Sequence, residues 1–125
     1  MYSVRIRDHI MIAHSLPDPF FGPASALHGA TYIVDAEFFN EKLNAYNVVL
    51  DIGYAHDMLK EVLKSLNYKN LDLEAAFRNH LTTTEFLAKY VHDQLMTRVQ
   101  DNFQGKIRVT LGESHVAWAS YGSDS

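Results

Sequence analysis

Two histidines are the first candidates for chemistry, because imidazole binds metal ions and transfers protons near neutral pH. His14 lies at the end of one predicted strand and His28 just before the next, so a hairpin would bring them close together. A catalytic zinc ion usually has three protein ligands. The obvious third position, two residues after His28 on the same strand face, is Ala30, which has no lone pair to donate. The residues alone therefore favour two separately hydrogen-bonded histidines over a shared metal ion.

A run of threonines followed by a glutamate opens a predicted helix. Thr82 and Glu85 have the spacing of a capping box, in which two side chains bond N–H groups at the start of a helix. Alternatively, the hydroxyls of Thr83 and Thr84 and the carboxylate of Glu85 could face a polar ligand. Without further observations, the capping interpretation is favoured.

Glu113 lies between the last two predicted strands, in an expected turn at 112–114. A carboxylate in a turn is usually only solvated. It could also accept hydrogen bonds from two adjacent N–H donors of a planar ligand, the reverse of an arginine–carboxylate pair. The spacing in the sequence leaves both interpretations open.

The elements that position these residues follow from the spacing of the apolar side chains. Alternation predicts four strands, at residues 2–13, 29–39, 106–111 and 115–121. The first strand changes phase near Asp8, which is typical of a β-bulge. Amphipathic stripes predict two helices, at residues 54–66 and 84–99. Asp51 is placed to cap the first helix, and the segments 15–27 and 67–82 are expected to be irregular connections.

The order of these elements, ββααββ, indicates an α+β fold in a single domain over residues 1–125. We expect an antiparallel four-stranded sheet with two helices on one face. Such a sheet leaves its second face and both edges uncovered, and strand edges carry unpaired N–H and C=O groups. The chain is therefore expected to form a homo-oligomer through those edges.

Composition excludes several classes of function. The chain has 11 Lys and Arg against 15 Asp and Glu, a net charge of −4, and no basic run, so nucleic acid is not an expected partner. It has no Cys, which excludes disulfides, a cysteine metal site and a cysteine nucleophile. No apolar run approaches the roughly 20 residues that span a bilayer. A soluble cytoplasmic protein without a membrane partner is expected.

Six short motifs together resemble the 6-pyruvoyl tetrahydropterin synthase family, which includes the bacterial 6-carboxytetrahydropterin synthases. The motifs are Met11–His14, Leu27–Ala30, Val49–Ile52, Leu66–Leu71, Thr83–Ala88 and Val109–Glu113, and they cover nearly the whole chain. The resemblance implies the tunnelling fold (T-fold), in which a trimer closes twelve strands into a barrel. It also implies a hexamer of two stacked trimers, with pockets between subunits.

The resemblance points to a lost zinc site and a lost catalytic triad. The family binds zinc through three histidines, of which two match His14 and His28, while the third position is Ala30. The family's catalytic cysteine, aspartate and histidine match Ala24, Asn67 and Tyr68. An alanine cannot act as a base, an asparagine does not titrate, and a tyrosine phenol is a poor base at neutral pH. We therefore expect no cofactor and no family synthase reaction.

The positions that hold the pterin ring in the family are present. Glu113 matches the glutamate that accepts hydrogen bonds from the ring N–H and the exocyclic amine, and Thr83, Thr84 and Glu85 match further contacts. The resemblance thus favours the ligand interpretation of Glu113, while Glu85 could serve both as cap and as contact. It implies a pterin-binding homologue that acts as a sensor, carrier or non-catalytic subunit.

Two alternatives keep an enzymatic role. One is a metal-independent aldolase- or lyase-type enzyme acting on a pterin. Its candidate acids and bases are Tyr68, His14, His28 and Glu85. The other is an active 6-pyruvoyl or 6-carboxytetrahydropterin synthase whose zinc site is rebuilt with another ligand such as His115 or His9. The second alternative requires both a new ligand and a new base.

Overall fold

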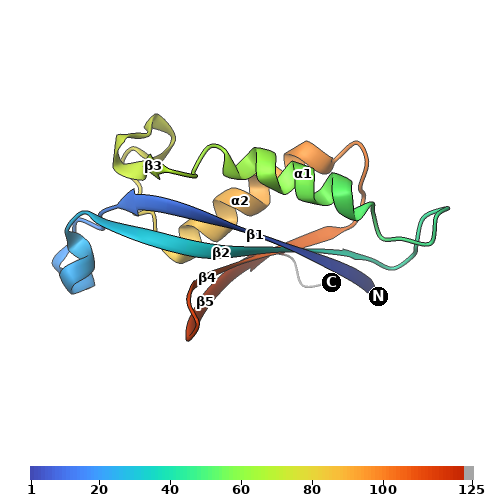
Figure 1. The fold of residues 1–125 in the computed structure, drawn as a ribbon, viewed down its shortest axis with the longest axis horizontal. Helices are drawn as coiled ribbons and strands as arrows, with labels where there is room; N and C mark the ends of the chain where they lie inside the picture. The colour runs from blue at the N-terminus through green and yellow to red at the C-terminus, as the bar shows by residue number, and fades with distance from the viewer. Residues whose placement is uncertain (123–125) are drawn as a thin grey trace.

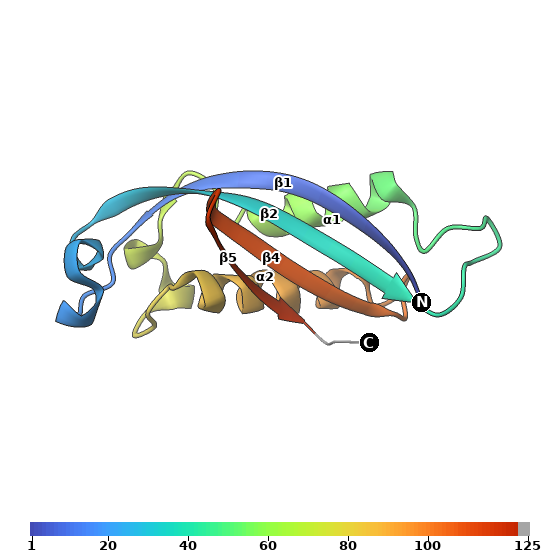
Figure 2. The same ribbon diagram turned by 90° about the horizontal axis from the view of Figure 1, so that it is seen from below.

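A computed structural model describes residues 1–122 of the chain. One mixed sheet runs in the order β3-β1-β2-β4-β5, and both long helices cover one of its faces (Figure 1). The strands are β1 (Tyr2–His14), β2 (His28–Asn40), β3 (Lys69–Asn70), β4 (Lys106–Ser114) and β5 (Ala117–Gly122). The helices are α1 (Ile52–Leu63) and α2 (Thr84–Val99), with short 3-10 segments η1 (Pro19–Ser25), η2 (Leu71–Leu73) and η3 (Ala75–Phe77). Seen from below, the sheet lies in front of both helices, and no helix of residues 1–122 covers its second face (Figure 2).

The predicted antiparallel four-stranded sheet is confirmed in its long strands, and β3 adds a fifth. This strand pairs in parallel with the end of β1, at the sheet edge. It lies in the segment 67–82, which was expected to be irregular and which also contains η2 and η3. Likewise, 15–27 contains η1. These elements are too short to show a periodic pattern of apolar residues.

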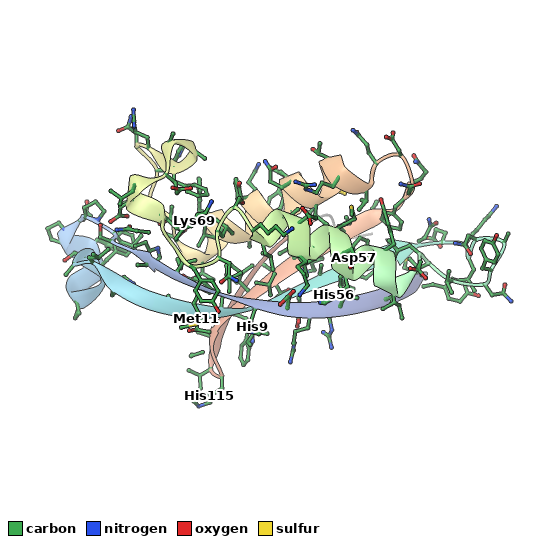
Figure 3. The ribbon with its side chains drawn as sticks, turned by 45° about the horizontal axis from the view of Figure 1, so that its top comes forward. His9, Met11, His56, Asp57, Lys69 and His115 are labelled. Atoms are coloured by element: carbon green, nitrogen blue, oxygen red, sulfur yellow. The ribbon has the colours of Figure 1, made fainter. Side chains whose placement is uncertain are left out.

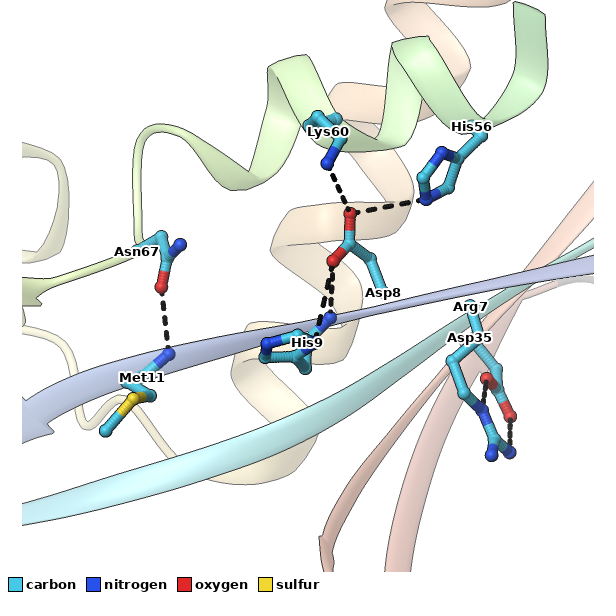
Figure 4. Close-up of polar contacts among 8 residues, drawn as sticks. All are labelled: Arg7, Asp8, His9, Met11, Asp35, His56, Lys60 and Asn67. Carbon is cyan, nitrogen blue, oxygen red and sulfur yellow. Dashed lines mark hydrogen bonds and ion pairs between the residues drawn. The ribbon is translucent and has the colours of Figure 1, made fainter. Parts of the chain in front are cut away.

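The predicted bulge near Asp8 is wrong, because β1 pairs with β2 in one unbroken register from Tyr2 opposite Asn40 to His14 opposite His28. The even-numbered side chains of β1 face the helices throughout. Asp8 is one of them, and its carboxylate contacts His56 Nε2 at 3.4 Å and Lys60 Nζ at 3.7 Å, both from α1 (Figure 4). A carboxylate at an inward position interrupts the apolar alternation, which mimics a change of phase.

The turn of the last hairpin lies at residues 115–116 and not at 112–114 as predicted. Glu113 is therefore a residue of β4, and the β4–β5 ladder has its irregularity between Gly112 and Ser114. A Cβ on Gly112 would lie 2.8 Å from Nε1 of Trp118, so this glycine makes room for an indole across the strands. The sequence suggested a turn at that glycine because glycines are also typical of turns.

Both predicted helices are present. Asp51 caps α1 as predicted, and its side chain accepts a hydrogen bond of 2.8 Å from the Tyr54 N–H. The helix begins two residues earlier and ends three residues earlier than the predicted 54–66, whereas α2 matches the predicted 84–99. No helix within residues 1–122 is long and apolar enough to cross a membrane.

The core fills the space between the helices and the sheet. Its largest fully buried side chains include Tyr32, Phe38, Ile10, Leu59 and Leu87. Phe38 packs edge-to-face on Phe103, with 5.3 Å between ring centroids. This layer packs β2 against both helices. The position of β2 in turn determines where His28, at its N-terminal end, lies.

Replacing Phe38 with alanine is expected to lower the free energy of unfolding by about 3–5 kcal/mol, because a fully buried ring leaves a cavity. Chemical denaturation at a fixed protein concentration measures the change. Phe20→Ala is the matched control, since this ring is 86% exposed and its loss should shift the value by less than about 0.5 kcal/mol. Equal effects of the two substitutions would contradict the core assignment.

Candidate functional site

A pocket of about 380 Å³ lies where the ends of β1 and β2 meet η1, the start of α2 and the end of β4. Seven of its lining residues are positions that the sequence had singled out. They are His14, Ala24, His28, Thr83, Thr84, Glu85 and Glu113. Segments far apart in the chain therefore converge on one cavity.

The acidic end of the pocket is built by β4, β2 and the first residue of α2. The Thr84 hydroxyl donates to Glu113 Oε2 at 3.5 Å, and Tyr32 lines the same pocket. Burial raises the pKa of the Tyr32 phenol, so this group stays neutral at neutral pH. Glu113 itself is exposed to solvent, which leaves its carboxylate accessible to a ligand.

The predicted capping box is wrong by one residue. Thr83 is the N-cap of α2, because its hydroxyl accepts a hydrogen bond of 3.1 Å from the Phe86 N–H. Thr82 is buried and its hydroxyl instead contacts His14. Glu85 therefore has no capping partner and lies in the first turn of α2, where a carboxylate interacts favourably with the helix dipole.

The two histidines lie side by side in the wall of the pocket. Their ring centroids are 4.7 Å apart, in an edge arrangement. His14 Nδ1 lies 2.9 Å from the Thr82 hydroxyl, and His28 Nδ1 lies 2.9 Å from the carbonyl oxygen of Ala26. Because a carbonyl only accepts, His28 carries its proton on Nδ1. Burial, and secondly the neighbouring His28, lower the pKa of His14.

These residues do not fit a zinc site with three histidine ligands of the kind that the family uses. Within residues 1–122, no group of three or more His, Cys, Asp or Glu is placed to hold a metal ion. The proposed replacement ligands lie elsewhere. His9 projects from the middle of β1, and His115 occupies the tip of the β4–β5 hairpin on the side away from the helices (Figure 3). Neither lines the pocket with His14 and His28.

Asn67 and Tyr68 lie at the sheet edge and not in the pocket. Asn67 Oδ1 accepts a hydrogen bond of 2.9 Å from the Met11 N–H (Figure 4), and the Tyr68 N–H donates to the Met11 carbonyl at 2.7 Å. Tyr68 adopts a φ of 60°, an unusual conformation for a bulky residue, and its side chain is largely exposed. The side chain of Asn67 therefore satisfies one N–H group on the edge of β1.

Three pocket residues were missed from the sequence. Tyr32 lines the pocket from the helix-facing side of β2, four residues after His28 and two after Ala30. Because alternate residues of a strand share a face, this spacing from His28 could have identified Tyr32 as a pocket residue. Leu16 and Phe21 belong to the proline-containing segment, which folds back through a hydrogen bond of 3.1 Å from the Leu16 N–H to the Ala24 carbonyl. No periodicity marks such a segment.

We expect the His14 imidazole to stay neutral to a lower pH than an ordinary histidine, whose pKa is 6.5. The unfolded chain then takes up a proton that the folded chain does not, so unfolding free energy falls as pH drops through about 6.5 toward the lower folded pKa. An NMR titration of the His14 ring, assigned by comparison with His14→Gln, measures the midpoint. The pH dependence of unfolding should be weaker in His14→Gln, and identical dependences would contradict the assignment.

Comparisons with known proteins agree with this architecture. A family model described as 6-pyruvoyl tetrahydropterin synthase matches residues 3–124. The Caenorhabditis elegans 6-pyruvoyl tetrahydropterin synthase superposes with a TM-score of 0.85 at 20% identity, over 98% of this chain and 96% of that chain. The Plasmodium vivax enzyme superposes with a TM-score of 0.75 at 17% identity, over 100% of both chains.

An uncharacterized protein from Wolinella succinogenes also superposes, with a TM-score of 0.78 at 13% identity over 98% of both chains. At such low identities these likenesses establish the fold alone. No curated protein matches the sequence. The family match nevertheless extends over almost the entire chain, so the chain belongs to the 6-pyruvoyl tetrahydropterin synthase family.

Proposed function

We propose that this chain binds a pterin in the pocket between Glu113 and the histidine pair and does not carry out the zinc-dependent synthase reaction. The observation that carries the proposal is the convergence of Glu113, Thr84, Thr83 and Glu85 on one cavity. These are the positions that the family resemblance assigns to pterin contacts. Family membership supports a pterin-related function in general terms.

The chemistry of the acidic end suits a pterin ring. The ring presents an N–H and an exocyclic amine side by side in one plane, and a carboxylate accepts both hydrogen bonds at once. The hydroxyl of Thr84 lies 3.5 Å from one carboxylate oxygen of Glu113, on the same side of the pocket. The neutral Tyr32 phenol and the apolar side chains of Leu16 and Phe21 provide walls for an aromatic ring.

The residues at the family's catalytic positions support the proposal that this chain does not carry out the zinc-dependent synthase reaction. The pocket contains Ala24 at the position of the family's catalytic cysteine, where an alanine cannot act as a base, and Ala30 supplies no metal ligand beside His14 and His28. The side-chain oxygen of Asn67 is already engaged by the Met11 N–H. A protein with this pocket would serve as a sensor, carrier or non-catalytic subunit.

One observation favours a metal-independent enzyme as the second candidate. His14, His28 and Glu85 line the same pocket, so proton donors and acceptors would lie beside a bound ligand. Tyr68, the other candidate acid or base, is absent from this set and would have to come from another subunit. Mass spectrometry after incubation with several dihydropterins separates the candidates, because only an enzyme forms a product.

Glu113→Ala is expected to weaken pterin binding by about 10- to 150-fold, which corresponds to about 1.5–3 kcal/mol for a hydrogen bond to a charged group. Quenching of pterin fluorescence measures the dissociation constant. Glu41→Ala is the matched control, because Glu41 is exposed outside the pocket and contacts only the N-terminal amine at 3.8 Å among the ion pairs of residues 1–122. Absence of saturation up to millimolar pterin would refute the proposal.

We also propose that the protein is a hexamer of two stacked trimers. The helices leave one sheet face open (Figure 2). By the strand register, Met11, Ile33 and Trp118 lie on that face, where they are 48%, 39% and 60% exposed. Single exposed apolar residues are ordinary, but a group on one open sheet face is typical of an interface.

Sedimentation velocity at micromolar concentration should therefore give one species of six times the 14.2 kDa chain mass. The sheet edges and open face would be buried in that assembly, which removes their apolar and unpaired groups from water. Observation of monomer alone at this concentration would contradict the oligomer proposal and leave the pterin proposal to its own test.

A further inference from the structure

The segment that joins β1 to β2 forms part of the pocket wall, yet it folds mainly on itself. Phe21 and Ala24 line the pocket from this segment. None of residues 17–25 is buried. Within residues 1–122, every hydrogen bond of residues 17–25 has its partner in residues 16–26. The chain's own helices and strands therefore do not hold this part of the wall by hydrogen bonds.

The segment has a defined shape of its own. The Leu16 N–H donates to the Ala24 carbonyl at 3.1 Å, which closes the loop at its base. The Asp18 carboxylate accepts a hydrogen bond of 2.8 Å from the Phe20 N–H. The rings of Phe20 and Phe21 pack edge-to-face, with 5.1 Å between their centroids. Compact loops of this kind, with close ends and internally packed side chains, are frequently functional.

Both ends of the segment are fixed, so any movement is limited to the segment itself. On the β1 side, the N–H and the hydroxyl of Ser15 donate to the carboxylate of Asp72 at 3.1 Å and 2.6 Å. On the β2 side, His28 Nδ1 donates to the Ala26 carbonyl at 2.9 Å. A stretch with few buried contacts between two fixed ends has low local stability, and lids over binding sites are drawn from such stretches.

A glycine lies in the middle of the segment. Gly22 has a φ of 57° and a ψ of −129°, a conformation that residues with a Cβ rarely adopt. A Cβ at this position would meet no described atom within 4 Å. The backbone conformation, and not a lack of space, therefore requires glycine here. Replacement of Gly22 by alanine would disfavour the observed shape of the segment without creating a clash.

We propose that residues 17–25 form a lid that opens to admit the ligand and closes on it, with Phe21 packed against the bound ring. This inference rests on the proposed pterin binding and adds a residue that positions the ring. Phe21 is half-buried and lines the pocket, whereas Phe20 is 86% exposed and does not line it. A flat heterocycle offers Phe21 an aromatic face, and their contact removes apolar surface from water.

Limited proteolysis of the intact protein with chymotrypsin tests the movement, since a protease cuts a segment that has opened locally. The free protein should be cut after Phe20 and Phe21. Addition of 7,8-dihydroneopterin at about ten times its dissociation constant should slow these cuts about tenfold, because the ligand stabilises the closed form. Tyr46 is the internal control, since it is equally exposed, at 86%, and lies in the loop between β2 and α1, away from η1 (Figure 1). Cleavage after Tyr46 should not change.

The glycine provides a second arm of the test. Gly22→Ala is expected to weaken dihydroneopterin binding about tenfold in a fluorescence titration, because alanine disfavours the closed conformation. The thermal unfolding midpoint should not change, since residues 17–25 contribute no buried side chain. Gly53→Ala is the matched control, because it makes the same change in α1, outside the pocket. This control should leave binding unchanged.

The two adjacent phenylalanines test which ring touches the ligand. Phe21→Ala should weaken dihydroneopterin binding about tenfold or more, because a buried aromatic contact is lost. Phe20→Ala removes the same side chain one residue away and should weaken binding less than about threefold. Equal losses in the two variants would overturn the assignment of Phe21.

The outcomes separate the lid from pterin binding itself. Saturable binding without protection of Phe20 and Phe21 would overturn the lid and leave pterin binding in place. Resistance of both sites in the free protein would also overturn the lid, because a neighbouring subunit would then hold the segment closed. Absence of saturable binding would overturn the pterin proposal, and this inference with it. Protection at Phe20 and Phe21 but not at Tyr46, together with weaker binding by Gly22→Ala, supports the lid.

Discussion

The pairing of β1 with β2 is the constraint on which the pocket depends. Thirteen residues of each strand pair in one register, which places His14 directly opposite His28. Because side chains alternate between the two faces, the same register turns His28, Ala30 and Tyr32 toward the helices. A shift of one residue would move all of them to the open face. The core around Phe38 prevents such a shift, since it would also expose the buried residues of β2.

The side of the pocket that carries Glu113 depends on an irregularity in the pairing of β4 with β5. The β4–β5 ladder shifts between Gly112 and Ser114, and bulges of this kind change the direction of a side chain at a sheet edge. Glu113 lies within that irregularity, close to the first hydroxyl of α2. The small size of Gly112 admits Trp118 across the strands, so packing on the open face and the position of the carboxylate on the pocket side are coupled.

The long, strongly periodic elements were predictable, and the failures have identifiable physical causes. The pattern at residues 84–99 predicted α2 correctly, because five buried apolar residues recur on one side of it. Asp8 was misread because its partners, His56 and Lys60, come from a distant helix. Either Thr82 or Thr83 could cap α2 by its type and position. Thr83 does so, because the hydroxyl of Thr82 contacts His14, a residue distant in the sequence. Tyr32 was missed because a buried tyrosine in a strand resembles ordinary core.

The charge of the pocket also bears on what a neighbouring subunit could add. The sheet edge that carries Asn67 and Tyr68 is near three lysines, each with an acidic partner in its own chain. The pairs are Lys60 with Asp8 at 3.7 Å, Lys64 with Glu61 at 2.6 Å and Lys69 with Glu74 at 3.6 Å. Exposed pairs of this kind stabilise little, but they add one negative charge for each positive one. An edge presented by a partner would therefore bring no excess positive charge from these lysines. No lysine or arginine of residues 1–122 lines the pocket, so no ammonium group from the pocket lining would compete with pterin N–H donors for the carboxylate oxygens of Glu113.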